Sequence, residues 1–361
     1  MHCTEAAADR AEKLIGCAAL CFAIELVLFK FLPDVSTATL QHGQSALGDF
    51  AQFEREYLVP GSVHHARFLG NYILYYLAQL LSHVDHSGDL RLHPLRVAAG
   101  ILTPCYAYIG AHCALVDRQG LQWRYFFVSY ALAVVMGLYV FYPADMPSLA
   151  FLSVALYFLL RERLPAALLL TLVTGLYRET SFHMVWFVAV WAWCDRSRLP
   201  GVRIGWLAAF GCAFVLEYVA VRHYFPGPVS SAGGVIVDPR ALFLDKGLLS
   251  LTLICSVGLA ALYPLACLLR LRGVDTLGAV GKVGTGDSVG TGGTVGPADW
   301  RLRFLVINCY AFPAWLVFYR MMAGNLSEFR MLFPALLPCM YGIAYGGRRC
   351  NSTVTASGYA R

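Results

Sequence analysis

The chain has 361 residues, of which 58% are hydrophobic and 14% are charged, and its formal net charge is +6 at pH 7. Because soluble proteins carry about 25% charged residues, this composition argues against a soluble class and predicts an integral membrane protein. Most of the positive charge is arginine, and no basic run alternates with aromatic residues, so no nucleic-acid partner is predicted.

Apolar segments separated by charged connections predict an all-α, polytopic fold. A span needs about 20 apolar residues, because the hydrocarbon core of a bilayer is roughly 30 Å thick. About ten transmembrane helices are predicted on this basis, over residues 14–32, 95–117, 125–142, 146–160, 164–177, 182–194, 204–221, 248–270, 303–319 and 331–345. We expect residues 1–346 to form a single transmembrane helical domain, followed by a cytoplasmic tail, 347–361.

Arginines mark every second connection, which gives the expected topology by the positive-inside rule. The basic connections carry Arg118, Arg124, Arg161, Arg163, Arg196, Arg198, Arg203, Arg270, Arg272, Arg301, Arg303, Arg348 and Arg349. Both termini then lie in the cytoplasm, provided that the apolar stretch 68–84 does not span. We therefore expect a first external segment, 33–94, in which an amphipathic helix over 68–84 lies in the membrane plane. The stretch 273–299, rich in Gly, Thr and Val, is expected to be a flexible cytoplasmic loop.

The most informative stretch consists of two short apolar runs, 164–177 and 182–194, which flank Arg178 and Glu179. A helix over the first run would be only about 21 Å long, which is less than the roughly 30 Å of the hydrocarbon core. The Arg-Glu pair is therefore expected to lie recessed below the membrane surface. Ionisable residues at that depth usually face a water-filled cavity and mark a functional site, although a structural ion pair that closes the turn is the alternative.

Charged residues from other segments are expected on the same outer side of the membrane. Asp49 lies early in the first external segment, Arg67 opens the in-plane helix, and Asp145 stands where a helix emerges, while Glu328 and Arg330 precede the last span. Carboxylates can act as general bases or metal ligands and arginines bind phosphate, so this convergence predicts an active site facing outward. Asp145 could instead cap the helix that follows it, and Glu328 and Arg330 could be ordinary interfacial charges.

Five short motifs in this order resemble those of the GT-C-type polytopic glycosyltransferases and their bacterial relatives. They are Gly48-Asp49-Phe50, Ala66-Arg67-Phe68-Leu69, Pro143-Ala144-Asp145-Met146, Gly-Leu-Tyr-Arg-Glu-Thr-Ser-Phe at 175–182 and Glu-Phe-Arg-Met-Leu-Phe-Pro at 328–334. The resemblance covers about residues 10–346.

This resemblance implies transfer of a sugar from a polyprenyl-phosphate-linked donor, on the non-cytoplasmic side of a bacterial inner membrane. Asp49 matches the first-loop acid that acts as base or metal ligand, and Arg178 matches the basic residue that contacts the lipid phosphate. We therefore assign catalysis to Asp49, Asp145 and Glu179, and substrate binding to Arg67, Arg178, Glu328 and Arg330. The expected partners are membrane lipid and the lipid-linked donor; a divalent metal is possible, and the oligomeric state is open.

Three other classes share parts of this pattern: an inner-membrane polysaccharide polymerase or ligase, a multi-pass transporter or flippase, and a non-catalytic assembly subunit. A transporter needs a polar path through both halves of the membrane, whereas an enzyme needs one vestibule. Within the spans, Glu25 and Glu217 are ionisable residues outside the clusters described, and Glu217 is interpreted as interfacial. A single cavity that opens outward is therefore the expected distinguishing feature.

Overall fold

The computed structural model describes residues 49–60, 67–84, 94–115, 144–225, 260–269, 299–323 and 332–342. The predicted spans 14–32 and 125–142, the tail 347–361 and almost all of the loop 273–299 lie outside these ranges. All regular structure within the described ranges is helical, so the predicted all-α class is confirmed for them.

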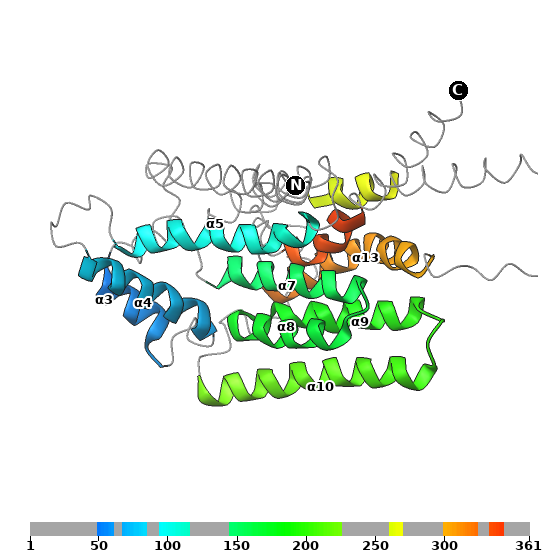
Figure 1. Cartoon of the computed structure of the whole chain (residues 1–361), viewed down its shortest axis with the longest axis horizontal. Helices are drawn as coiled ribbons and strands as arrows, with labels where there is room; N and C mark the ends of the chain where they lie inside the picture. The colour runs from blue at the N-terminus through cyan, green and yellow to red at the C-terminus, as the bar shows by residue number, and fades with distance from the viewer. Residues whose placement is uncertain are drawn as a thin grey trace, which may run out of the picture.

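Four consecutive helices are joined by short turns, and the last of them lies at the lower edge of the view in Figure 1. They are α7 (Asp145–Leu160), α8 (Leu164–Tyr177), α9 (Phe182–Cys194) and α10 (Pro200–Tyr224). The turn between α7 and α8 contains Glu162 with a φ of 60°, the left-handed conformation that commonly ends a helix. Prolines stand in the first turns of α8 and α10, where the missing N–H has no helical partner to lose.

Three further helices pack against these four and complete one hydrophobic core: α13 (Asp299–Ala323) and two short helices, Ala260–Leu269 and Leu332–Gly342. A fourth helix, α5 (Pro94–Leu115), packs against α7. Phe187, Trp191 and Phe304 are fully buried in this core. Ser153 on α7 joins two neighbours, because its hydroxyl donates to the Gly110 carbonyl (3.2 Å) and its carbonyl accepts from the Tyr341 hydroxyl (3.0 Å).

A second, smaller cluster lies beyond the ends of α8 and α10 (Figure 1). It contains α3 (Phe50–Phe53), the π-helical turn η1 (Glu54–Leu58) and α4 (Phe68–Val84), which pack against the first part of α5. Leu74 and Ala78 of α4 are buried against Leu95 and Ala99 of α5. The predicted helix over 68–84 therefore exists, and it pairs side by side with α5; its orientation in a membrane stays a prediction.

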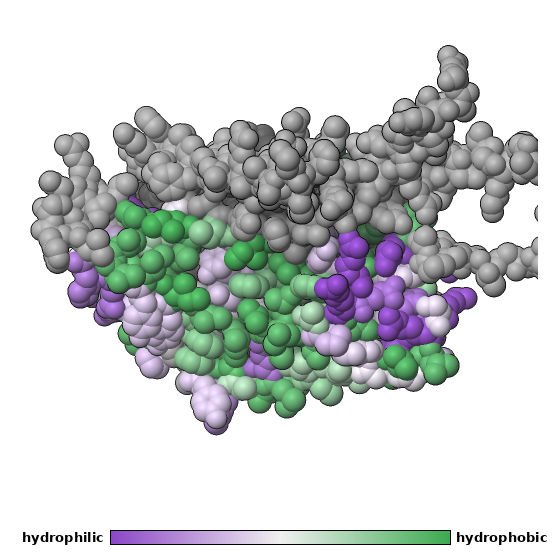
Figure 2. Space-filling model, viewed as in Figure 1, coloured by the Kyte–Doolittle hydropathy of each residue, from purple (hydrophilic) through white to green (hydrophobic). Residues whose placement is uncertain are grey.

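The two ends of the helical bundle differ in charge. At one end, seven arginines stand beside two acidic residues: Arg161, Arg163, Arg196, Arg198, Arg203, Arg301, Arg303, Glu162 and Asp195. We call this the basic end, and Figure 2 shows hydrophilic residues gathered there on the right, next to a largely hydrophobic middle. The opposite end, where α7 and α9 begin and α8 and α10 finish, is called the site end.

Two described helices are long and apolar enough to cross a membrane by length and composition: α10 and the Trp300–Tyr319 part of α13. Other apolar helices in the described ranges are shorter, among them α7 and α8. The structure thus supports membrane-compatible helices, and the arrangement with about ten spans stays a prediction.

Candidate functional site

A buried ion pair joins two helices at the site end. Asp145 is the first residue of α7, and Arg178 follows the last residue of α8 in an extended conformation. The Arg178 guanidinium donates to the Asp145 carboxylate, and the two side chains are only 8% and 7% exposed. The alternative role of Asp145 as a helix cap is not observed, because Ala144 occupies the cap position and no side chain caps the helix.

Glu179 forms a second ionic cluster immediately beside this pair. Its carboxylate accepts from Arg222 Nη2 at 2.9 Å and lies 3.7 Å from Arg67 Nε. Burial raises the pKa of Glu179, but the positive charges of Arg67, Arg178 and Arg222 and its own backbone N–H outweigh burial and hold that pKa below its usual range. Arg178 and Glu179 thus each bind a residue of another segment: Arg178 binds Asp145, and Glu179 binds Arg222.

The helices that supply these arginines meet through an aromatic contact. Arg67 directly precedes α4, and Arg222 lies in the last turn of α10. The next residue after Arg67, Phe68, stacks on Phe225 with ring centroids 4.1 Å apart and nearly parallel planes. This stacked pair holds the start of α4 against the end of α10, so the two guanidinium groups reach the same carboxylate.

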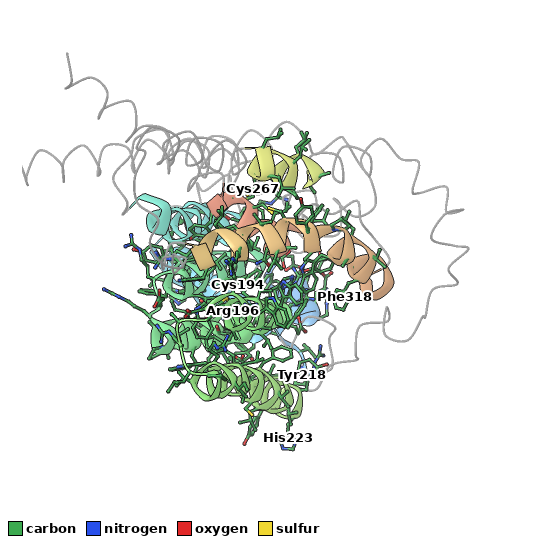
Figure 3. The ribbon with its side chains drawn as sticks, turned by 90° about the vertical axis from the view of Figure 1, so that its right-hand side faces the viewer. Cys194, Arg196, Tyr218, His223, Cys267 and Phe318 are labelled. Carbon is green, nitrogen blue, oxygen red and sulfur yellow. The ribbon has the colours of Figure 1, made fainter. Side chains whose placement is uncertain are left out.

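A small pocket opens beside Glu179, between α8 and α10. Its volume is about 20 Å³, which is room for a water-sized group, and it is lined by Gly175, Glu179, Ser181, Phe214, Glu217, Tyr218, Val221 and Arg222. Figure 3 labels Tyr218 on α10, together with His223 further along the same helix. Within the described part of the chain, four buried atoms of these residues lack a hydrogen-bond partner: both Glu217 oxygens, Arg222 Nη1 and Ser181 Oγ.

A chain of hydrogen bonds fixes the turn between α8 and α9. The Tyr319 hydroxyl lies 2.6 Å from His183 Nε2, and His183 Nδ1 lies 3.0 Å from the Thr180 carbonyl. Because a carbonyl only accepts, Nδ1 carries the proton and Nε2 accepts from Tyr319. The Thr180 and Ser148 hydroxyls are 3.1 Å apart, which ties the same turn to α7. The turn that carries Glu179 is thus held by α7 and α13.

The structure brings together four of the predicted site residues: Arg67, Asp145, Arg178 and Glu179. Asp49 lies away from these four residues. Its carboxylate accepts the Ala51 N–H at 2.9 Å and caps α3. The neighbouring Phe50 packs on Tyr75, with ring centroids 5.7 Å apart. Tyr75 is eight residues, or about 12 Å, along α4 from Arg67. Glu328 and Arg330 lie outside the described residues.

Two residues of the site were not found from the sequence. The sequence does not single out Arg222, and it favours an ordinary interfacial charge at Glu217. The available signal was their position: both are ionisable residues near the end of an apolar helix, on the side where Arg178 was predicted. Among the residues that the structure describes, no three His, Cys, Asp or Glu side chains are arranged to hold a metal ion.

Comparisons of the chain with protein-family models, with curated proteins and with solved structures find no match.

Proposed function

We propose that the protein is a multi-pass membrane glycosyltransferase that moves a sugar from a polyprenyl-phosphate-linked donor to an acceptor on the non-cytoplasmic side. The observation that carries this proposal is that two arginines, Arg67 and Arg222, meet at the Glu179 carboxylate. Glu179 and Arg222 also line an open pocket that contains a second carboxylate. Such a transfer needs positive charge for the departing phosphate and a carboxylate for the attacking hydroxyl.

Exposed apolar surface supports a membrane location. On α10, Ile204, Leu216 and Val219 are each more than half exposed, whereas a helix of a soluble protein would direct such a face into the core. The basic end fits the cytoplasmic side under the positive-inside rule, so the site end would face outward. This orientation agrees with about ten spans and cytoplasmic termini.

The short helix α8 supports a recessed site. Its 14 residues extend about 21 Å, so its end falls below the surface of a hydrocarbon core of roughly 30 Å. At that depth a lipid-linked donor could place its phosphate beside the arginines while its tail stays among acyl chains. Arg178 is engaged by buried Asp145, so in this proposal it holds the turn, and Arg67 and Arg222 contact the phosphate.

The apolar middle of the bundle favours an enzyme over a transporter. Between the site end and the basic end, the core contains the fully buried side chains of Leu152, Phe187 and Phe304. The pocket lies at the site end and its lining residues belong to α8, η3 (Glu179–Ser181) and α10. A reaction vestibule needs access from one side, and in the described part of the chain apolar side chains lie between this pocket and the other end.

The proposal is tested with purified protein in lipid nanodiscs and a panel of polyprenyl-phosphate donors that carry radiolabelled sugars. We expect label to pass from the donor to an added lipid or glycan acceptor, with release of polyprenyl phosphate. Arg222→Ala should abolish the transfer, because the guanidinium that faces the pocket is lost. Absence of transfer from every donor in the panel would contradict the proposal.

A further inference from the structure

Unpaired polar atoms are concentrated in one pocket of the molecule. Of the eight buried side-chain nitrogen and oxygen atoms without a hydrogen-bond partner among the described residues, four belong to Ser181, Glu217 and Arg222. All three residues line the pocket beside Glu179. Buried polar groups are normally satisfied, so a cluster of unsatisfied ones in a hollow indicates a site for a small group that forms hydrogen bonds, such as water or a ligand hydroxyl.

Gly175 makes room for the Glu217 carboxylate at this pocket. A Cβ atom built at Gly175 would overlap the Glu217 carboxylate, so only glycine lets that carboxylate lie against the backbone of α8. Other helical glycines have no such constraint: a Cβ at Gly205 or Gly211 of α10 would meet nothing within 4 Å. The position of the Glu217 carboxylate thus depends on a missing side chain on the facing helix.

The two carboxylates at the pocket, Glu179 and Glu217, differ in their partners. Glu179 is bound by Arg67 and Arg222, so its oxygens are engaged. Glu217 has both oxygens free within the described part of the chain, and each can accept a hydrogen bond. A hydroxyl group is the complementary ligand, since it donates one hydrogen bond, carries no charge and matches a space of about 20 Å³.

We propose that this pocket receives a hydroxyl group of a polyhydroxylated acceptor and that Glu217 accepts its proton; this rests on the proposed glycosyl transfer. The acceptor oxygen forms a bond to the anomeric carbon of the donor sugar while the bond from that carbon to the phosphate oxygen breaks. The electron pair leaves with the polyprenyl phosphate beside Arg67 and Arg222, and the acceptor proton passes to a Glu217 oxygen. Ser181 Oγ holds the hydroxyl in place.

The test uses three variants of the full chain: Glu217→Gln, Gly175→Ala and, as a matched control, Gly211→Ala. We expect Glu217→Gln to lower kcat by about 100-fold or more, as the loss of a general base does, with an unchanged KM for the donor. Gly175→Ala should lower kcat as well, because its methyl group displaces the carboxylate, while Gly211→Ala should match the parent protein. Undiminished kcat in Glu217→Gln would overturn the inference.

A binding measurement keeps the pocket assignment separate from the transfer. The carboxyl group of Glu217 is labelled with dicyclohexylcarbodiimide and quantified by mass spectrometry, with and without methyl glucoside, methyl mannoside and methyl galactoside. Protection by any of these glycosides in the parent protein, absent in Gly175→Ala, is the expected result. Protection without transfer would reject the donor class and retain the hydroxyl site, whereas labelling that no glycoside changes would overturn the site.

Discussion

The Arg178 guanidinium and the Asp145 carboxylate form a buried ion pair that joins the end of α8 to the start of α7. These residues are 33 positions apart, and neither is more than 8% exposed. Removal of one partner takes this ion pair away from a charge that stays buried. The pair therefore fixes the geometry of the turn that carries Glu179.

We expect Arg178→Ala or Asp145→Ala to lower the free energy of unfolding by about 3–5 kcal/mol, because a buried charge loses its partner. The double variant Asp145→Leu/Arg178→Met should be less destabilised than either single variant, since no charge remains buried. The measurement is unfolding in mixed micelles of detergent and sodium dodecyl sulfate. Losses that simply add in the double variant would show that the two side chains act independently.

The stability provided by Glu179 should depend on pH in a defined direction. Its pKa in the folded protein lies below the ordinary carboxyl value of about 4.3, so its stabilising effect is complete above that value. The effect is lost as the pH falls through the lower folded-state pKa. The difference in unfolding free energy between the parent protein and Glu179→Gln should thus be constant from neutral pH to about pH 5 and shrink below about pH 4. A difference that vanishes before pH 5 would contradict this sign.

The two ends of the bundle should lie on opposite sides of the membrane. In a cysteine-free background, His223→Cys places a thiol at the exposed end of α10, and Ser197→Cys places one at the basic end. An impermeant maleimide added to whole cells should label the first position, and the second only after the cells are broken open. Labelling in the opposite pattern would reverse the assigned orientation.

The sequence predicts both ends of α8 and of α9 correctly, because nearby charged residues end each apolar run. Arg178 and Glu179 interrupt two apolar runs, and a helix cannot bury such charges against lipid without partners. The identity of those partners could not be predicted. Asp145 and Arg222 lie in other helices, and the choice between them and the adjacent charge depends on how those helices rotate and pack.

The position of Asp49 relative to the site could not be predicted from the sequence. Its place in the first external segment predicts a position at the site, but the packing of Phe50 and Phe53 on Tyr75 sets α3 further along α4. The role of Glu217 could not be predicted for a related reason. In a sequence, a carboxylate at the membrane interface cannot be distinguished from an unpaired carboxylate in a pocket. Only the close approach of α8 at Gly175 distinguishes them.

Two carboxylates in matched surroundings provide the most direct test of the central claim, that the site end performs sugar transfer. Glu179 binds Arg222 at 2.9 Å and Arg67 at 3.7 Å, with 33% of its side chain exposed. Glu162 at the basic end binds Arg198 at 2.7 Å and Arg301 at 3.4 Å, with 34% exposed. Each Gln substitution therefore removes one negative charge from a cluster with two arginines, Glu179→Gln at the site end and Glu162→Gln at the basic end.

The measurement is the rate of sugar transfer from polyprenyl phosphate in Glu179→Gln and Glu162→Gln, compared at equal amounts of folded protein. We predict that Glu179→Gln slows transfer by about 100-fold, because Arg67 and Arg222 lose the carboxylate that positions them. Glu162→Gln should transfer sugar at the rate of the parent protein. Equal rates in the two variants would contradict the account, because the site end would then contribute no more to transfer than the basic end.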